Sequence, residues 1–135
     1  MTQGLRITFL LHAIVALAFG LVMYLVPVWF GATIQWTPLD PLMTSFMGAA
    51  LLALGVSSAF GYRAAHWEDV RILVIADAVF TVTGVVAALY YLLFVGAPLF
   101  AWVPALLWGL FAVAWIVFYV QATHSAPQMA GAHHP

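Results

Sequence analysis

Residues 7–30 read ITFLLHAIVALAFGLVMYLVPVWF, a run without lysine, arginine, aspartate or glutamate. A helix needs about 20 mostly apolar residues to cross the hydrocarbon core of a membrane. Three later stretches are similarly apolar, at residues 42–62, 72–95 and 100–121, and only one charged residue, Asp77, falls within them. The sequence therefore predicts an all-α membrane protein built as a bundle of four transmembrane helices.

The composition favours lipid as the solvent for most of the chain. Of 135 residues, 67% are hydrophobic and 5% are charged, whereas a soluble domain carries about 25% charged residues. The net charge of −1 offers no basic surface for nucleic acid. Cysteine is absent, which excludes disulfides, thiolate metal sites and iron–sulfur clusters. We expect one transmembrane domain over residues 1–122 and an irregular polar tail over residues 123–135.

The connections between the spans carry turn signals. Pro38 and Pro41 lie in the segment 31–41, where two prolines forbid a continuous helix and favour an extended turn. Pro41 also suits the first turn of the next helix, where no backbone donor is missed. Residues 96–98 read Gly-Ala-Pro, which predicts a tight turn and an antiparallel hairpin of the third and fourth spans.

The arginines predict the orientation of the spans. Arg6 precedes the first span, and Arg63 and Arg71 flank the connection between the second and third spans. The other two connections contain no lysine or arginine. Positive residues favour the cytoplasmic side of a membrane, so we expect both termini and the middle connection to be cytoplasmic. The expected location is the cell membrane, as a multi-pass protein of a bacterial inner membrane.

Small residues recur along the second span at every fourth position. Membrane helices associate through close packing of such residues, and residues four apart share a helix face. We therefore predict that this stripe packs against another helix of the bundle. Its members are Ala49, Ala53, Ser57 and Gly61.

His12 and Asp77 are ionisable side chains well inside the predicted spans. Each lies six residues from an arginine, which is about 9 Å along a helix axis. Ser57, with Ser58 beside it, lies at a similar depth, and Thr81 follows Asp77 by one helical turn. We predict that these five side chains form one polar cluster in the half of the bundle nearest the arginines.

Two interpretations of this cluster stay open. An aspartate at the centre of a membrane helix costs about 2.5–3.5 kcal/mol, so His12 is its expected partner. The pair is then either a structural hydrogen bond or a site that handles a proton or binds a head group. An imidazole can also ligate haem or chlorophyll, although no second histidine lies at matching depth. We predict no catalytic set, metal site or cofactor, expect bound lipid, and leave contact with a quinone or pigment open.

Aromatic residues follow one face of the fourth span at spacings of three and four. This face is expected either to dock another subunit or a flat hydrophobic ligand, or to be exposed to lipid. It comprises Trp108, Phe111, Trp115 and Phe118, with Pro104 one turn earlier.

Three stretches carry a resemblance to a known group of proteins. These are FLLHAIVALAFGLVMYLVP at residues 9–27, Leu-Asp-Pro at residues 39–41 and FMGAALLALGV at residues 46–56. Together they resemble the DoxX-like proteins, small uncharacterised bacterial membrane proteins with four helices. The resemblance spans residues 7–121 and implies a four-helix fold. It carries no residue-level function over to this chain.

The sequence leaves two hypotheses about function. The favoured one is a non-catalytic accessory or structural subunit of a larger membrane complex, such as a respiratory or photosynthetic electron-transfer assembly. Its expected partners are membrane lipids and other membrane subunits. The alternative is a small membrane enzyme or carrier that acts on a lipid-soluble substrate through His12 and Asp77.

Overall fold

The computed structural model describes residues 1–36 and 38–125, and this part of the chain is helical without strands. Four of its helices are long and apolar enough to cross a membrane, which confirms the predicted number of long apolar helices. They are α1 (Gln3–Leu25), α3 (Pro41–Arg63), α4 (Arg71–Tyr90) and α5 (Trp102–Ser125). Three short elements complete the fold, α2 (Pro27–Thr33), η1 (Tyr91–Val95) and η2 (Leu99–Ala101).

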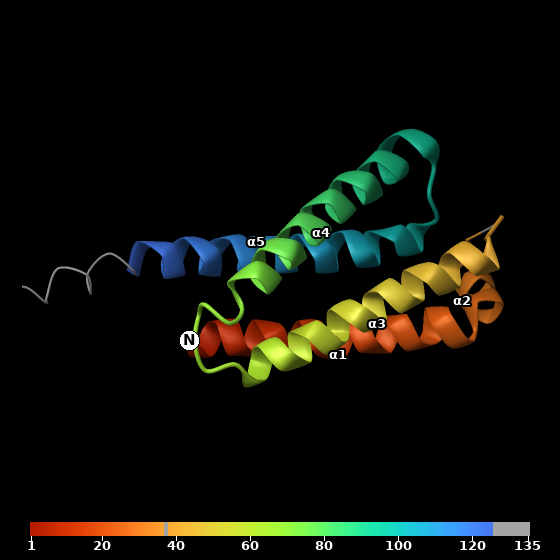
Figure 1. Ribbon diagram of the computed structural model, residues 1–135. Coiled ribbons are helices and arrows are strands. Elements are labelled where there is room, and N and C mark those ends of the chain that lie inside the picture. Colours follow the sequence, from red (N-terminus) through yellow and green to blue (C-terminus); the bar gives the residue numbers. More distant parts are fainter. Residues whose placement is uncertain (37, 126–135) are drawn as a thin grey trace, which may run out of the picture.

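The long helices form two hairpins (Figure 1). Helix α1 packs along α3, and α4 packs along α5, whereas α1 meets α5 and α3 meets α4 over shorter stretches. The predicted tight turn between the last two spans is present. Gly96 adopts a left-handed backbone with φ of 89°, a conformation that glycine adopts without steric cost.

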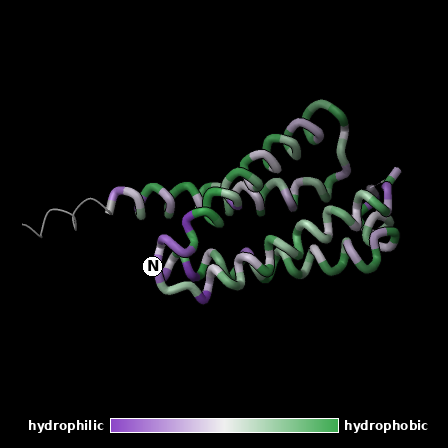
Figure 2. The backbone as a smooth tube through the Cα atoms, viewed as in Figure 1, coloured by the Kyte–Doolittle hydropathy of each residue, from purple (hydrophilic) through white to green (hydrophobic). Residues whose placement is uncertain are grey.

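The two ends of the bundle differ in polarity. The start of α1, the end of α5 and the connection between α3 and α4 lie together at one end (Figure 1), and hydrophilic residues gather there (Figure 2). We call this the basic end, because it carries Arg6, Arg63 and Arg71. The opposite end carries α2 and the turn at residues 96–98, and we call it the open end.

The first span ends earlier than predicted. Helix α1 stops at Leu25, and Pro27 begins the separate helix α2, so the predicted continuous span to residue 30 is wrong. Proline lacks a backbone N–H and disfavours a helical conformation in the residue before it. Val26 accordingly leaves the helical region, with φ of −135° and ψ of 54°. The predicted extended segment is also shorter, because α2 continues to Thr33.

The start of α3 and the end of α5 follow from local sequence. The side chain of Asp40 accepts hydrogen bonds from the backbone N–H groups of Leu42 and Met43, and Pro41 occupies the first turn as predicted. Helix α5 continues to Ser125, so residues 123–125 are helical and not part of an irregular tail. The rest of the predicted tail, residues 126–135, lies outside the described residues.

The contact face of α3 is rotated from the predicted stripe. Ala49 and Ala53 are exposed, and the hydroxyl of Ser57 bonds to its own helix at the carbonyl of Leu54. Of the predicted four, Gly61 is buried. A strict step of four residues drifts by about 40° per step around a helix with 3.6 residues per turn, so it leaves the contact face. The buried residues are instead spaced by steps of three or four, and they are Thr44, Gly48, Leu51, Gly55, Ser58 and Gly61.

Two glycines bring α1 and α3 together. A Cβ atom on Gly48 would lie 2.6 Å from the backbone nitrogen of Tyr24, and one on Gly20 would lie 2.9 Å from the backbone nitrogen of Leu52. The obstacle in both cases is backbone, which cannot move aside as a side chain can. Glycine at these positions therefore allows the close helix contact that membrane bundles use.

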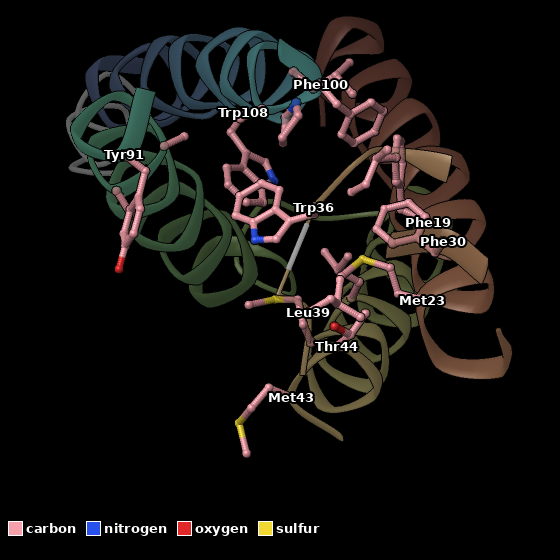
Figure 3. Close-up of a pocket in the computed structure, with 18 of the residues that line it drawn as sticks. Phe19, Met23, Phe30, Trp36, Leu39, Met43, Thr44, Tyr91, Phe100 and Trp108 are labelled. Atoms are coloured by element: carbon pink, nitrogen blue, oxygen red, sulfur yellow. The ribbon is translucent and has the colours of Figure 1, made fainter. Parts of the chain in front are cut away.

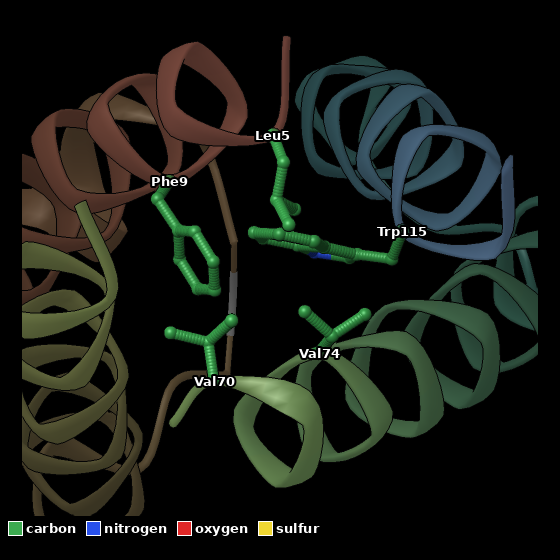
Figure 4. Packing of buried hydrophobic residues seen from close by; sticks show 5 residues of the cluster. All are labelled: Leu5, Phe9, Val70, Val74 and Trp115. Carbon is green, nitrogen blue, oxygen red and sulfur yellow. The ribbon is translucent and has the colours of Figure 1, made fainter. Parts of the chain in front are cut away.

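An apolar cluster fills the basic end (Figure 4). Phe9, Val74 and Trp115 are fully buried, and Leu5 and Val70 are almost so. The rings of Phe9 and Trp115 lie 4.8 Å apart, centroid to centroid. This core joins α1, α4 and α5, so it holds the two hairpins together at the basic end.

The aromatic face of α5 points inward over its C-terminal half. Trp115 belongs to the core, and the ring of Phe118 lies so near Gly4 that a Cβ atom there would be 2.7 Å from it. The expectation that Trp115 docks a partner or faces lipid is therefore wrong, because residues of α1 and α4 cover it. Phe118 packs against α1 but is partly exposed, so for this residue the expectation stays a prediction.

Candidate functional site

A chain of three buried polar side chains joins α1, α3 and α4. The Nδ1 atom of His12 lies 2.8 Å from the hydroxyl oxygen of Ser58. That hydroxyl lies 3.3 Å from Oδ2 of Asp77, to which it donates a hydrogen bond in the described geometry. The direct distance from His12 Nδ1 to Asp77 Oδ2 is 3.7 Å. The exposed fractions are 3% for His12, 0% for Ser58 and 1% for Asp77. These three side chains, which we call the polar chain, are therefore almost completely buried.

The predicted cluster is thus brought together in part. His12, Ser58 and Asp77 meet as their similar depths indicated. Thr81 is also buried, but its hydroxyl donates to the backbone carbonyl of Asp77 and not to any of these three side chains. Ser57 lies outside it, because its side chain turns back to α3. Ser58 occupies the contact face of α3, whereas Ser57 follows the predicted stripe that leaves it.

Aromatic rings fix the position of the imidazole. The ring of Phe111 lies 4.8 Å from that of His12, and the ring of Trp115 lies 5.5 Å away, both edge to face. Such arrangements of rings are favourable. Since both aromatic residues belong to α5, the imidazole contacts the second hairpin through these two rings as well as through Asp77 of α4. The Nε1 atom of Trp115 is itself buried without a hydrogen-bond partner among the described residues.

Beyond His12, a cleft of about 460 Å³ opens among the four long helices toward the open end. Figure 3 shows side chains from several elements around this space. Its walls are mainly aromatic and aliphatic. They include Phe19, Met23, Phe30, Trp36, Leu39, Met43, Met47, Phe100, Trp108 and Phe111.

His12 closes the inner end of this cleft. The α1 residues along the wall run from His12 through Phe19 to Met23, which places the imidazole nearest the basic end. Asp40 lies at the other limit of the cleft, where its carboxylate caps α3. Thr44 donates its hydroxyl hydrogen to the backbone carbonyl of Asp40. These two polar residues are thus engaged in starting a helix, whereas His12 presents a side chain to the inner cleft.

Half of the predicted aromatic face of α5 belongs to the cleft. Trp108 and Phe111 line it, in contrast to Trp115 and Phe118. Trp108 rests on α4, where a Cβ atom on Gly84 would lie 2.8 Å from its ring. The expectation of a docking surface for a flat hydrophobic ligand therefore applies to these two residues and stays a prediction. The cleft itself could not be found from the sequence, because its walls come from segments far apart in the chain.

Comparisons with known proteins do not extend this description. No protein-family model, curated protein or solved structure matches the chain. The resemblance to DoxX-like proteins therefore stays a prediction. Within residues 1–36 and 38–125, no group of three histidine, aspartate or glutamate side chains is arranged to hold a metal ion.

Proposed function

We propose that this protein binds a lipid-soluble molecule inside the membrane, with the molecule's apolar body in the cleft and its polar end at His12. One observation carries the proposal: a cleft of about 460 Å³ with apolar walls ends at a buried imidazole. Small-molecule sites commonly have about 300–1,000 Å³, mostly apolar walls and a few polar groups that fix the orientation of the ligand. The protein would act as a carrier or enzyme for that molecule.

The polarity of the walls defines the ligand. A water-soluble molecule would lose its hydration on entering and would meet few hydrogen-bonding partners, which is costly. A lipid-soluble molecule enters from a solvent as apolar as the walls, so it loses little. It can also contact aromatic rings, since Phe19, Phe100 and Trp108 line the space.

The role of an accessory subunit in a larger complex stays an untested prediction. Two features favoured it at the level of sequence, the small residues of the second span and the aromatic face of the fourth. The buried small residues of α3 pack inside the chain, and Trp115 and Phe118 face α1. Neither feature therefore requires a partner, whereas the cleft has no occupant from the chain among the described residues.

The arginines support an orientation for the site. Arg6, Arg63 and Arg71 lie at the basic end, and positive residues favour the cytoplasm, so the open end would face away from it in the cell membrane. Because the chain has no cysteine, Ala65→Cys at the basic end and Ala32→Cys on α2 give clean labelling sites. We expect labelling of these two variants from opposite sides of the membrane. Labelling of both from one side would contradict this orientation.

The ligand proposal is tested by filling the cleft. Ala88 of α4 lines the cleft, whereas Ala76 of the same helix is exposed on the outside of the bundle. Binding of 2-methyl-1,4-naphthoquinone in lipid nanodiscs should raise the melting temperature of the wild type, because a ligand that binds the folded state stabilises it. Ala88→Phe should abolish this rise, and Ala76→Phe should keep it. An equal rise in all three proteins would mean that the molecule acts through the lipid.

A further inference from the structure

His12 is the one residue shared by the polar chain and the cleft. Its Nδ1 atom is engaged with Ser58, and the residue lines the cleft wall. The Nε2 atom has no hydrogen-bond partner among the described residues. Nε2 is not among the fully buried atoms without a partner, of which Trp115 Nε1 is the one found among the described residues. The small exposed part of His12 therefore leaves this nitrogen open to a hydrogen-bonding group that enters the cleft.

Electrical neutrality determines which hydrogen-bonding role Nε2 has. Inside a membrane a net charge is expensive unless it is paired. Two arrangements make the pair of His12 and Asp77 neutral overall. In the first, Asp77 is ionised and the imidazole is protonated on both nitrogens. In the second, protonated Asp77 donates to the hydroxyl of Ser58, which donates to Nδ1, so the imidazole hydrogen is on Nε2. Both arrangements place a hydrogen on Nε2.

The remaining arrangements are less favourable. An ionised Asp77 beside a neutral imidazole protonated on Nδ1 leaves one negative charge in the cluster. Arg6 and Arg71, which could compensate this charge, are exposed at the basic end. A guanidinium nitrogen of Arg71 also lies 4.0 Å from Oε2 of Glu68, so this arginine already has an acidic partner. Protonated Asp77 beside the same imidazole would make both side chains donate to Ser58, whose own hydroxyl hydrogen would then have to turn to a carbonyl of α3. The neutral states in which Ser58 accepts from one of the two side chains and donates to the other are therefore those in which Nε2 donates into the cleft.

We infer that the cleft recognises a carbonyl oxygen on an otherwise apolar ligand, which accepts a hydrogen bond from Nε2–H of His12. This inference rests on the proposed function and adds the chemical class of the ligand to it. Ser58 and Asp77 are positioning residues, because they fix the orientation of the imidazole and the nitrogen that carries the hydrogen. Binding requires no transfer of electrons or protons.

The experiment compares two probes that share a ring skeleton. One is 2-methyl-1,4-naphthoquinone, which has carbonyl oxygens, and the other is 2-methylnaphthalene, which has none. The absence of cysteine excludes thiol adducts with the quinone. In lipid nanodiscs, after correction for the partition of each probe into lipid, we expect the wild type to prefer the quinone about tenfold, as one net hydrogen bond would give. The carbonyl stretching band of the quinone should move to lower frequency on binding.

Matched variants assign the preference to the polar chain. His12→Leu should bind both probes with similar affinity. Ser58→Ala should reduce the preference about threefold, since the imidazole loses the partner that orients it. Ser57→Ala is the control, because that neighbouring hydroxyl bonds to its own helix, and it should retain the full preference.

Each outcome decides between the two proposals. Binding of neither probe by the wild type would overturn the proposed function itself. Equal binding of both probes, or an unshifted carbonyl band, would leave a ligand-binding cleft but overturn the carbonyl inference. If His12→Leu fails to fold, the band position in the wild type and the comparison of Ser58→Ala with Ser57→Ala still decide the question.

Discussion

The basic end and the open end of the bundle use the same kinds of side chain but pack them differently. At the basic end Phe9 and Trp115 are fully buried between the hairpins. At the open end Phe19, Phe100 and Trp108 are partly exposed and line a cleft. Aromatic content therefore does not decide which end is filled.

Connectivity explains the difference. The connection between α3 and α4 is the one that joins the two hairpins, and it lies at the basic end. Arg6 of α1 donates a hydrogen bond of 3.4 Å to the carbonyl of Ala64, which fastens the start of this connection to the first hairpin. At the open end, both connections join helices within a hairpin. Nothing covalent there draws the hairpins together, and space remains between them.

The largest expected effect is the loss of the basic-end core. Trp115→Ala removes a fully buried side chain, which costs about 3–5 kcal/mol. Trp115→Phe should cost much less, because the ring is largely kept and Nε1 has no hydrogen bond to lose among the described residues. Reversible unfolding in detergent measures both. A similar loss in the two variants would mean that the indole nitrogen has a partner after all.

The second prediction concerns packing within the first hairpin near the open end, where we expect α1 and α3 to be closely packed even though a cleft separates the two hairpins. Gly48 contacts the backbone of α1 near Tyr24, whereas Ala49 is exposed. Gly48→Leu should destabilise the protein by at least about 1–3 kcal/mol, the usual cost of overpacking. Ala49→Leu should change stability by less than about 0.5 kcal/mol. The reverse order would restore the predicted stripe and rotate α3.

The third prediction concerns the polar chain between the two ends. His12→Leu or Asp77→Leu leaves the other buried ionisable side chain with Ser58 alone as its side-chain partner, at a cost of about 1–3 kcal/mol. The double variant should recover much of this loss, because Ser58 can then bond to a carbonyl of its own helix. A double-mutant cycle of unfolding free energies measures the coupling. Strictly additive losses would show that the two side chains do not interact.

The sequence was most informative where a signal is local. The four apolar runs, the tight turn at residues 96–98 and the proline start of α3 were predicted, since each depends on a few neighbouring residues. The meeting of His12 and Asp77 was also predicted, because depth in a membrane can be counted from the arginines. Pro27 is an exception among the local signals. The apolar run on both sides of it predicted one continuous helix, whereas its ring ends α1 and begins α2.

Features that depend on rotation or on tertiary contacts were missed. A shift of one residue on α3 moved the contact face from Ala49 to Gly48, because a step of four does not follow a helix of 3.6 residues per turn. The inward position of Trp115 depends on where α1 lies. The cleft results from how two hairpins are joined, and no single segment records it. These properties belong to the assembly of the helices.

The smallest expected change in stability comes from the cleft wall at the open end. Met47 lines the cleft and is 42% exposed, so Met47→Ala removes few contacts and should alter stability by less than about 0.5 kcal/mol. Binding of 2-methyl-1,4-naphthoquinone should nevertheless weaken severalfold, because the bound ligand would contact the Met47 side chain more extensively than the rest of the protein does. Leu110→Ala, on the outer face of α5 with 71% exposure, is the control and should affect neither property. A large loss of stability in Met47→Ala with unchanged binding would mean that the open end is packed like the basic end. Separate effects on binding and stability would instead place the two properties at opposite ends of one bundle.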